Sequence, residues 1–311
     1  MTVGVMISGM VPHVISDLRD LAELAGDLEG AGVGEFVIGE HLLQAPGMAH
    51  PGDSSGKLKW DYERPFLEPY VALAAISART STAHLTTGAV LGATRPAVLL
   101  AKTVASLDVL SGGRASLGVA SGWWAPELSA AGVKMEDRLA KVDELIAVCR
   151  LLWGEQPVSF SGKWTSFDNV WSYPRPLRGA RTPIWFGGRP STGTMNRVVR
   201  ACDGWMGSQA ASLDDVAKAV QLLKEACERH GRPISELGIR ATVPPSVREG
   251  GGGFTQILGR ACSYAEQLVC LGVTNVCLPL AQLVTSRDEA CQFVEAFKDA
   301  IAGSAAASRL I

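Results

Sequence analysis

The sequence predicts an α/β fold, a single (β/α)8 TIM barrel with insertion loops at the carboxyl ends of its strands. Short apolar runs alternate with longer segments of helical periodicity along the chain. About eight such strand–helix units fit into 311 residues, which favours a closed barrel over an open doubly wound sheet. Two long connections, at 42–65 and 154–181, interrupt this rhythm. We expect one domain over residues 1–311, with a flexible tail from residue 303.

In the first half of the chain, each short apolar strand precedes a helical segment. Leu18, Leu21, Leu24 and Leu28 recur at the spacing of one helix face. Pro96 suits the first turn of a helix, where the N–H that it lacks would have no helical partner. Strands are predicted at 3–7, 36–38, 84–91 and 114–120, and helices at 16–31, 68–78, 96–110 and 135–153.

The second half repeats the pattern. Asp214 and Asp215 lie in the first turn of a helical segment, where the helix dipole favours negative charge. Trp153, Trp185 and Trp205 fall within helix or strand runs, so we expect them in the core. Strands are predicted at 183–186, 204–207, 237–243 and 275–280, and helices at 191–201, 213–230, 256–271 and 287–301.

The two long connections differ in character. The first is rich in Gly, Pro, Asp and Ser and carries Trp60 and Tyr62. The second contains two alternating runs around Gly162, which predict a β-hairpin over 158–167. Connections of this length in a compact domain usually carry function.

Composition excludes several classes of protein. The net charge is −2, from 29 basic and 31 acidic residues without a basic stripe, so we expect neither a nucleic-acid nor a membrane partner. No apolar run approaches the roughly 20 residues that span a bilayer. Seven cysteines without paired spacing favour reduced thiols and a cytoplasmic protein. The five histidines lie far apart, so we expect no metal site.

Residues 110–124 carry the most local information. Ser111-Gly112-Gly113 predicts a helix end, because glycine accepts the left-handed conformation of a C-terminal cap. A small, apolar strand follows and opens into Ser121-Gly122-Trp123-Trp124. In a parallel barrel the carboxyl ends of the strands bind ligands. Two tryptophans beside a bare glycine there indicate a pocket for a flat ring.

From residue 3 to 300, the order and spacing of short motifs resemble the bacterial luciferase-like flavin oxidoreductase family. Glu40-His41, the loop with Trp60 and Tyr62, and the helix start at 66–71 are most similar to its branch that uses the deazaflavin coenzyme F420. The resemblance implies a (β/α)8 barrel and an oxidoreductase that uses coenzyme F420 or FMN. The motifs are Glu40-His41, Leu110-Ser-Gly-Gly-Arg114, Gly118-Val-Ala-Ser-Gly122, Leu151-Leu-Trp153, Pro174-x-Pro176, Pro183-Ile-Trp-Phe-Gly-Gly188 and Asp203-Gly-Trp205.

The resemblance assigns the proton chemistry to His41, next to the hydride-carrying carbon of the cofactor. An imidazole can donate or accept a proton near neutral pH. Glu40 either orients that imidazole or caps a backbone amide. Family members have a non-prolyl cis peptide at the position of Gly88-Ala89, against the back of the cofactor ring, whereas an ordinary strand glycine is the alternative.

Other residues are expected to bind the cofactor. Ser121 and Gly122 would contact its ring or side chain. Gly187, Gly188, Arg189 and Ser191 precede a helix, where free amides and a guanidinium bind phosphate; a simple capped turn is the alternative.

Arg95 is a second basic candidate, or else a surface residue before Pro96. The substrate pocket is expected to include Trp60, Tyr62, Trp123 and Trp124, which favour an apolar or aromatic substrate. Trp123 stands where the sugar-phosphate dehydrogenases of the deazaflavin group have a catalytic acid, and Glu127 follows four residues later. A core or dimer-interface role is the alternative for one of these tryptophans.

The function predicted from these residues is hydride transfer between coenzyme F420 and an apolar or aromatic organic substrate. One alternative is an FMNH2-dependent two-component monooxygenase that uses O2 and receives reduced flavin from a partner reductase. Another is a non-catalytic flavin-binding protein of the same fold. The resemblance also implies a homodimer packed through barrel helices.

Overall fold

Eight parallel strands form a closed barrel in the computed structural model, which describes residues 1–8, 14–46, 48 and 63–303. The sheet runs in the order β3-β2-β1-β11-β10-β9-β8-β5, and pairing of β3 with β5 closes it. The predicted barrel is therefore confirmed. Its strands are β1 (Thr2–Met6), β2 (Glu35–Ile38), β3 (His84–Thr87) with its continuation β4 (Val90–Leu91), β5 (Ala115–Ala120), β8 (Ile184–Gly187), β9 (Gly204–Met206), β10 (Gly238–Thr242) and β11 (Asn275–Leu278).

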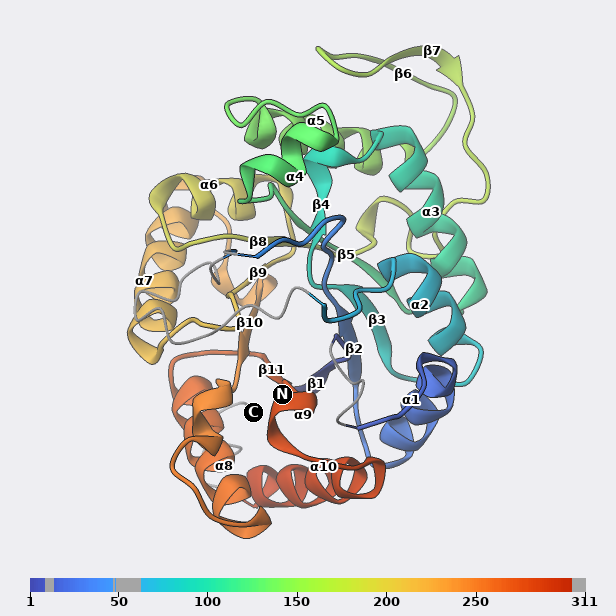
Figure 1. The fold of residues 1–311 in the computed structure, drawn as a ribbon. Helices are drawn as coiled ribbons and strands as arrows, with labels where there is room; N and C mark the ends of the chain where they lie inside the picture. The colour runs from blue at the N-terminus through green and yellow to red at the C-terminus, as the bar shows by residue number, and fades with distance from the viewer. Residues whose placement is uncertain (9–13, 47, 49–62, 304–311) are drawn as a thin grey trace.

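Helices surround the barrel (Figure 1). The predicted helix at 16–31 begins late, at Leu21, after a short 3-10 turn over Leu18–Asp20. The other predicted helices match to within three residues at each end, whereas the short α4 and α9 were not predicted. The helices are α1 (Leu21–Gly30), α2 (Pro69–Ser77), α3 (Ala97–Leu110), α4 (Ala125–Ala130), α5 (Arg138–Trp153), α6 (Thr192–Ala201), α7 (Leu213–His230), α8 (Phe254–Cys270), α9 (Leu280–Leu283) and α10 (Arg287–Ala302).

The third barrel strand is broken between β3 and β4, where a continuous strand over 84–91 was predicted. The Gly88–Ala89 peptide in the break is cis, as the resemblance implied. Next to the break, the Thr87 hydroxyl donates to the Gly118 carbonyl (2.7 Å) and accepts from the Gly118 amide (2.9 Å). A Cβ on Gly118 would lie 1.7 Å from the Thr87 carbonyl oxygen. The strand therefore approaches β5 so closely that only glycine fits opposite Thr87.

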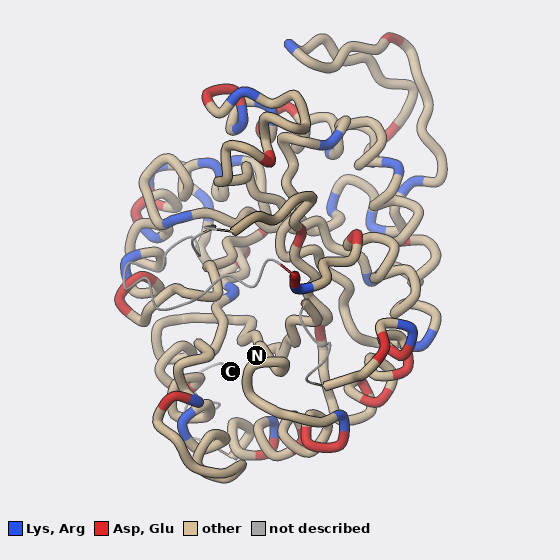
Figure 2. The backbone as a smooth tube through the Cα atoms, viewed as in Figure 1, with Lys and Arg blue, Asp and Glu red and all other residues tan. Residues whose placement is uncertain are grey.

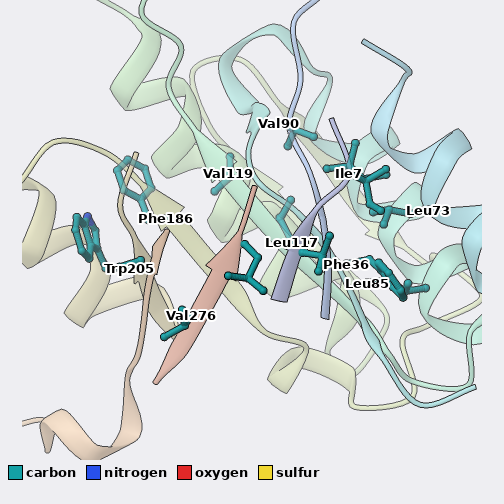
Figure 3. Packing of buried hydrophobic residues seen from close by; sticks show 14 of the residues in the cluster. Ile7, Phe36, Leu73, Leu85, Val90, Leu117, Val119, Phe186, Trp205 and Val276 are labelled. Atoms are coloured by element: carbon teal, nitrogen blue, oxygen red, sulfur yellow. The ribbon is translucent and has the colours of Figure 1, made fainter. Parts of the chain in front are cut away.

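The hydrophobic core fills the space between the strands and the surrounding helices. Figure 3 shows Phe36 of β2 and Leu85 of β3 near Leu73 of α2, and all three side chains are fully buried. Trp153 and Trp205 are also fully buried, and Trp185 is buried inside the barrel. The expected core position of these three tryptophans is confirmed.

A polar cluster lies inside the barrel among these apolar residues. The Arg240 guanidinium lies 4.4 Å above the ring centre of Trp185 and forms a buried ion pair with Glu35. Glu35 also accepts hydrogen bonds from Thr86 (2.6 Å) and Asn275 (3.2 Å). Four strands, β2, β3, β10 and β11, are thus tied together by one buried carboxylate.

Arg114 explains much of the Leu-Ser-Gly-Gly-Arg motif. Gly112 and Gly113 have φ of +71° and +89°, which confirms the predicted glycine cap of α3. The buried guanidinium that follows donates to the carbonyl oxygens of Ser111 (2.7 Å) and Thr80 (2.9 Å), at the ends of α3 and α2. It also reaches the Ser77 and Ala83 carbonyls. This part of the motif serves the structure, because it caps two helices at once.

The predicted hairpin forms β6 (Val158–Ser161) and β7 (Ser166–Val170), which extend beyond the ring of helices (Figure 1). Its tip is held to α5, because the Glu144 carboxylate accepts from the amides of Lys163 (2.7 Å) and Trp164 (3.0 Å).

Basic and acidic residues are interspersed along the outer helices (Figure 2). All seven cysteines are free thiols. In the part of the chain that the structure describes, no helix is both long and apolar enough to cross a bilayer.

Candidate active site

Small residues from three neighbouring strands meet at the carboxyl end of the barrel. A Cβ on Gly187, at the end of β8, would lie 3.6 Å from the Ala120 methyl and 3.7 Å from the Ala89 methyl. Met206, at the end of β9, lies 3.3 Å from the same point. The structure thus brings together Gly88-Ala89 and Gly187, which were predicted from separate segments. Glycine and alanine residues and the flexible Met206 side chain thus form the surface where these strands meet.

His41 follows β2 on the same rim. The end of β2 adjoins the strand break, since a Cβ on Gly39 would lie 3.3 Å from the Gly88 carbonyl oxygen. The side chain of His41 is only 10% exposed. Its ring meets those of Phe66 and Trp123 edge to face, at centroid distances of 5.3 and 5.9 Å. Two apolar rings thus hold the imidazole in place and exclude water from its flanks.

Glu127 is the acidic neighbour of this imidazole. Its Oε2 lies 3.2 Å from His41 Nδ1. Its Oε1 accepts from the amides of Leu42 (2.6 Å) and Leu43 (3.2 Å), and the side chain is 1% exposed. Glu127 comes from α4, a helix too short for its periodicity to be recognised, so it was not among the predicted site residues. The available signal was its place four residues after Trp123.

Of the two roles predicted for Glu40, orienting the imidazole or capping a backbone amide, the structure shows the second. Its carboxylate accepts from the Leu91 amide (2.7 Å) and is bound by Arg95, which also pairs with Glu68 (2.7 Å). Burial alone would lower the pKa of Arg95, but its bonds with Glu40 and Glu68 outweigh this effect and raise it. Glu40 therefore ties the end of β2 to β4, and the carboxylate beside the imidazole is Glu127. Arg95 is therefore not a simple surface residue before Pro96, because it pairs with Glu40 and Glu68.

The segment after β5 turns sharply into α4. Gly122 has φ of +81°, and a Cβ there would lie 2.8 Å from Leu128 Cδ2, so a side chain does not fit. Ser121 is half-buried beside it, and the half-buried Trp124 is the residue that precedes α4. Of the two predicted tryptophans in this segment, Trp123 contacts His41.

The segment from Gly188 to Ser191 leads into α6. Ser191 Oγ accepts from the Thr194 amide (3.1 Å). This is the capped turn that was predicted as the alternative to a phosphate site. Trp205 Nε1 donates to the Gly188 carbonyl (2.9 Å) and fixes the start of the turn. Arg189 and Ser191 are exposed, so they can contact a ligand at this helix start.

Two predicted pocket residues, Trp60 and Tyr62, lie outside the described residues. Within the described ranges, no group of three or more His, Cys, Asp or Glu side chains could hold a metal ion.

The fold and the site define a parallel (β/α)8 barrel protein with a half-buried histidine on the rim where the barrel strands end. The chain belongs to the luciferase-like monooxygenase family, whose sequence model matches residues 1–251. An uncharacterised protein of Mycobacterium tuberculosis is 30% identical over 252 residues, which cover 77% of this chain and 89% of that relative.

Solved structures share the fold over nearly the whole chain. The monooxygenase RslO1 from Streptomyces bottropensis has a TM-score of 0.76 at 20% identity and covers 97% of this chain and 98% of its own. An F420-dependent secondary alcohol dehydrogenase, solved with an F420-acetone adduct, has a TM-score of 0.73 at 16% identity and covers 96% and 98%. Enzymes that use F420 and enzymes that use FMN are both among the similar structures.

Proposed function

We propose that the protein transfers a hydride between coenzyme F420 and an apolar or aromatic organic substrate, with His41 as the group that gives or takes the accompanying proton. The observation that carries this proposal is the position of His41. It stands on the rim of the barrel beside the Gly88-Ala89 and Gly187 surface, between the rings of Phe66 and Trp123.

The residues on the rim fit a planar cofactor. Gly88, Ala89 and Gly187 would lie against its ring, and Ser121 and Gly122 would border it. Gly188, Arg189 and Ser191 would hold a phosphate at the start of α6, where Arg189 is exposed. The bound deazaflavin supplies the hydride acceptor or donor. The protein supplies binding, orientation and the proton at the His41 imidazole.

The surroundings of His41 favour an apolar substrate. Phe66 and Trp123 flank the imidazole, and Leu42 and Leu43, which follow it, are 47% and 48% exposed. Apolar walls exclude water from a hydride transfer and bind apolar substituents.

An FMNH2-dependent monooxygenase with a partner reductase is the second candidate. Trp123 favours it, because this residue stands where the resemblance to the deazaflavin dehydrogenases would place an acid. Titrating the protein with coenzyme F420 and with FMN, followed by fluorescence quenching, distinguishes the two. We expect micromolar binding of F420, and FMN binding without any F420 response would reverse the proposal.

Removing the imidazole tests the proton chemistry. We expect His41→Ala to lower turnover by about 10²–10⁴-fold, because general acid–base catalysis is lost, while F420 binding changes little. His84→Ala is the matched control, since this exposed histidine begins β3 at the opposite end of the barrel. Unchanged turnover in His41→Ala would remove His41 from the mechanism. If the wild type binds F420 or FMN but turns over none of a panel of apolar substrates, the result would instead support a non-catalytic flavin-binding protein.

A further inference from the structure

Three nitrogen atoms surround the buried carboxylate of Glu127. Leu42 and Leu43 present their amides to Oε1, and His41 Nδ1 lies 3.2 Å from Oε2. An ionised carboxylate only accepts hydrogen bonds, whereas a neutral imidazole has one donor and one acceptor nitrogen. The two backbone amides stabilise the ionised form, because both point at the same oxygen. The nitrogen that faces Glu127 must then carry the ring proton.

We infer that Glu127 is a positioning residue that fixes the tautomer of His41, with the proton on Nδ1 and the lone pair on Nε2. The edge-to-face contacts of the imidazole with Phe66 and Trp123 oppose rotation of the ring, which would exchange the two nitrogens. In this tautomer of the neutral ring, Nε2 is the acceptor nitrogen. The assignment follows from the contact of Nδ1 with the Glu127 carboxylate.

For the reaction, the inference rests on the proposed function. If the substrate is an alcohol, its oxidation would give a carbonyl compound, with a hydride passing from carbon to the bound cofactor and a proton released from the hydroxyl group. The proton requires an acceptor, and Nε2 provides it only if Nδ1 already holds the ring proton. The resulting imidazolium is stabilised by Glu127, which keeps its negative charge. In the reduction direction, Nε2 returns the proton to the substrate oxygen.

The same carboxylate also sets the path of the chain after His41. Its bonds to two consecutive amides fix the backbone of Leu42 and Leu43, whose side chains are exposed. The acceptor nitrogen and the first apolar side chains of the long connection are thus positioned by one side chain.

The test is Glu127→Gln, which preserves the shape of the side chain. The amide oxygen of glutamine can continue to accept from Leu42 and Leu43, so its NH2 group then faces Nδ1. Nδ1 must become the acceptor, and the ring proton moves to Nε2. We expect ¹⁵N spectra of ring-labelled histidine, at a pH where the imidazole is neutral, to show Nδ1–H in the wild type and Nε2–H in the variant.

Two further variants complete the experiment. His41→Ala assigns the signal by removing it. Glu144→Gln is the matched control, because Glu144 also binds two consecutive amides, those of Lys163 and Trp164, but lies away from the rim. We expect Glu144→Gln to leave both the His41 tautomer and turnover unchanged. Glu127→Gln should lower turnover by about 10²–10⁴-fold with little change in cofactor binding.

The spectra separate this inference from the proposed function, because they need neither cofactor nor substrate. A wild-type spectrum with the proton on Nε2 would overturn the inference, even if Glu127→Gln failed to fold. An unchanged tautomer in a folded Glu127→Gln variant would also overturn it. Inversion of the tautomer in a protein that binds neither F420 nor FMN would support the role of Glu127 and contradict the proposed function.

Discussion

Glu29, on α1, is a carboxylate with both oxygens engaged by the turn before β3. It accepts from the amides of Ser81, Thr82 and Ala83. Burial alone would raise the pKa of Glu29, but these hydrogen bonds together outweigh burial and lower it to about 2. The folded state thus prefers the ionised form more strongly than the unfolded chain does.

The expected consequence is a pH-dependent stability. The folded pKa of Glu29 lies below the ordinary glutamate value of 4.5, so its stabilisation is complete above the unfolded pKa and is lost as the pH falls toward 2. We expect Glu29→Gln to lower the free energy of unfolding by about 1–2 kcal/mol at neutral pH. The difference from wild type should shrink between about pH 5 and pH 2.

Urea denaturation at several pH values measures this effect. Glu228→Gln, on the exposed surface of α7, serves as control and should differ little from wild type at any pH. If the difference in free energy of unfolding between Glu29→Gln and wild type stays constant with pH, the lost contacts do not depend on the carboxylate charge.

Residue-level prediction succeeded for local contacts and missed a distant one. The predicted cap at Ser191 forms with the Thr194 amide, three positions away. Ser212 and Ser286, which were not predicted, cap α7 and α10 in the same way. The carboxylate beside His41 is 86 positions away in the sequence, so spacing could not identify it. Glu40, the neighbour in sequence, pairs with Arg95 instead.

At the scale of elements, the ends of α2 and α3 depend on one side chain. Arg114 donates to carbonyl groups of both helix ends and of the turn between α2 and β3. We expect Arg114→Leu to destabilise the protein by about 2–4 kcal/mol, because it leaves several buried carbonyl oxygens without donors.

Chemical denaturation measures this loss in the free energy of unfolding, from the shift of the transition midpoint at an unchanged m-value. Arg200→Leu, on the exposed side of α6, is the matched control and should cost less than about 0.5 kcal/mol. Equal stability of the two variants would show that water replaces the guanidinium at the helix ends.

The elements were predicted best where a strong local signal marks their ends. The range of α7 matches because Ser212 begins it and Gly231, at φ of +64°, ends it. The break between β3 and β4 has no such signal, because peptide geometry cannot be derived from residue types; the resemblance alone implied it. Helix α4 was not predicted, because six residues contain too few turns to show a helical period of apolar residues.

At the scale of the whole molecule, α3 carries exposed apolar side chains that the barrel does not cover. Leu99 is 61% exposed and Leu110 is 75% exposed, and Leu177 lies nearby against Gly113 at 64%. Lys102 is the only basic residue along α3, and its only acidic residue, Asp108, is buried. A second copy can therefore meet this face without opposing like charges.

We propose that the expected homodimer uses this face. Light scattering should give a dimer for the wild type and a monomer for the double variant Leu99→Glu, Leu110→Glu. The matched control is Leu139→Glu on α5, a residue that is 37% exposed, which should remain dimeric. A monomeric wild type would contradict the proposal directly.

The polar cluster inside the barrel has a consequence for synthesis of the chain. Glu35 and Thr86 belong to the first third of the sequence, whereas Arg240 and Asn275 come from its last third. A nascent chain that has reached only β9 holds the carboxylate without its cation, which is costly in an apolar interior. We therefore expect the early strands to complete their native packing only after β10 and β11 have been synthesised. This ion pair and the pairing of β1 with β11 join the two ends of the sequence, and a fragment cut between them would lack a native interior.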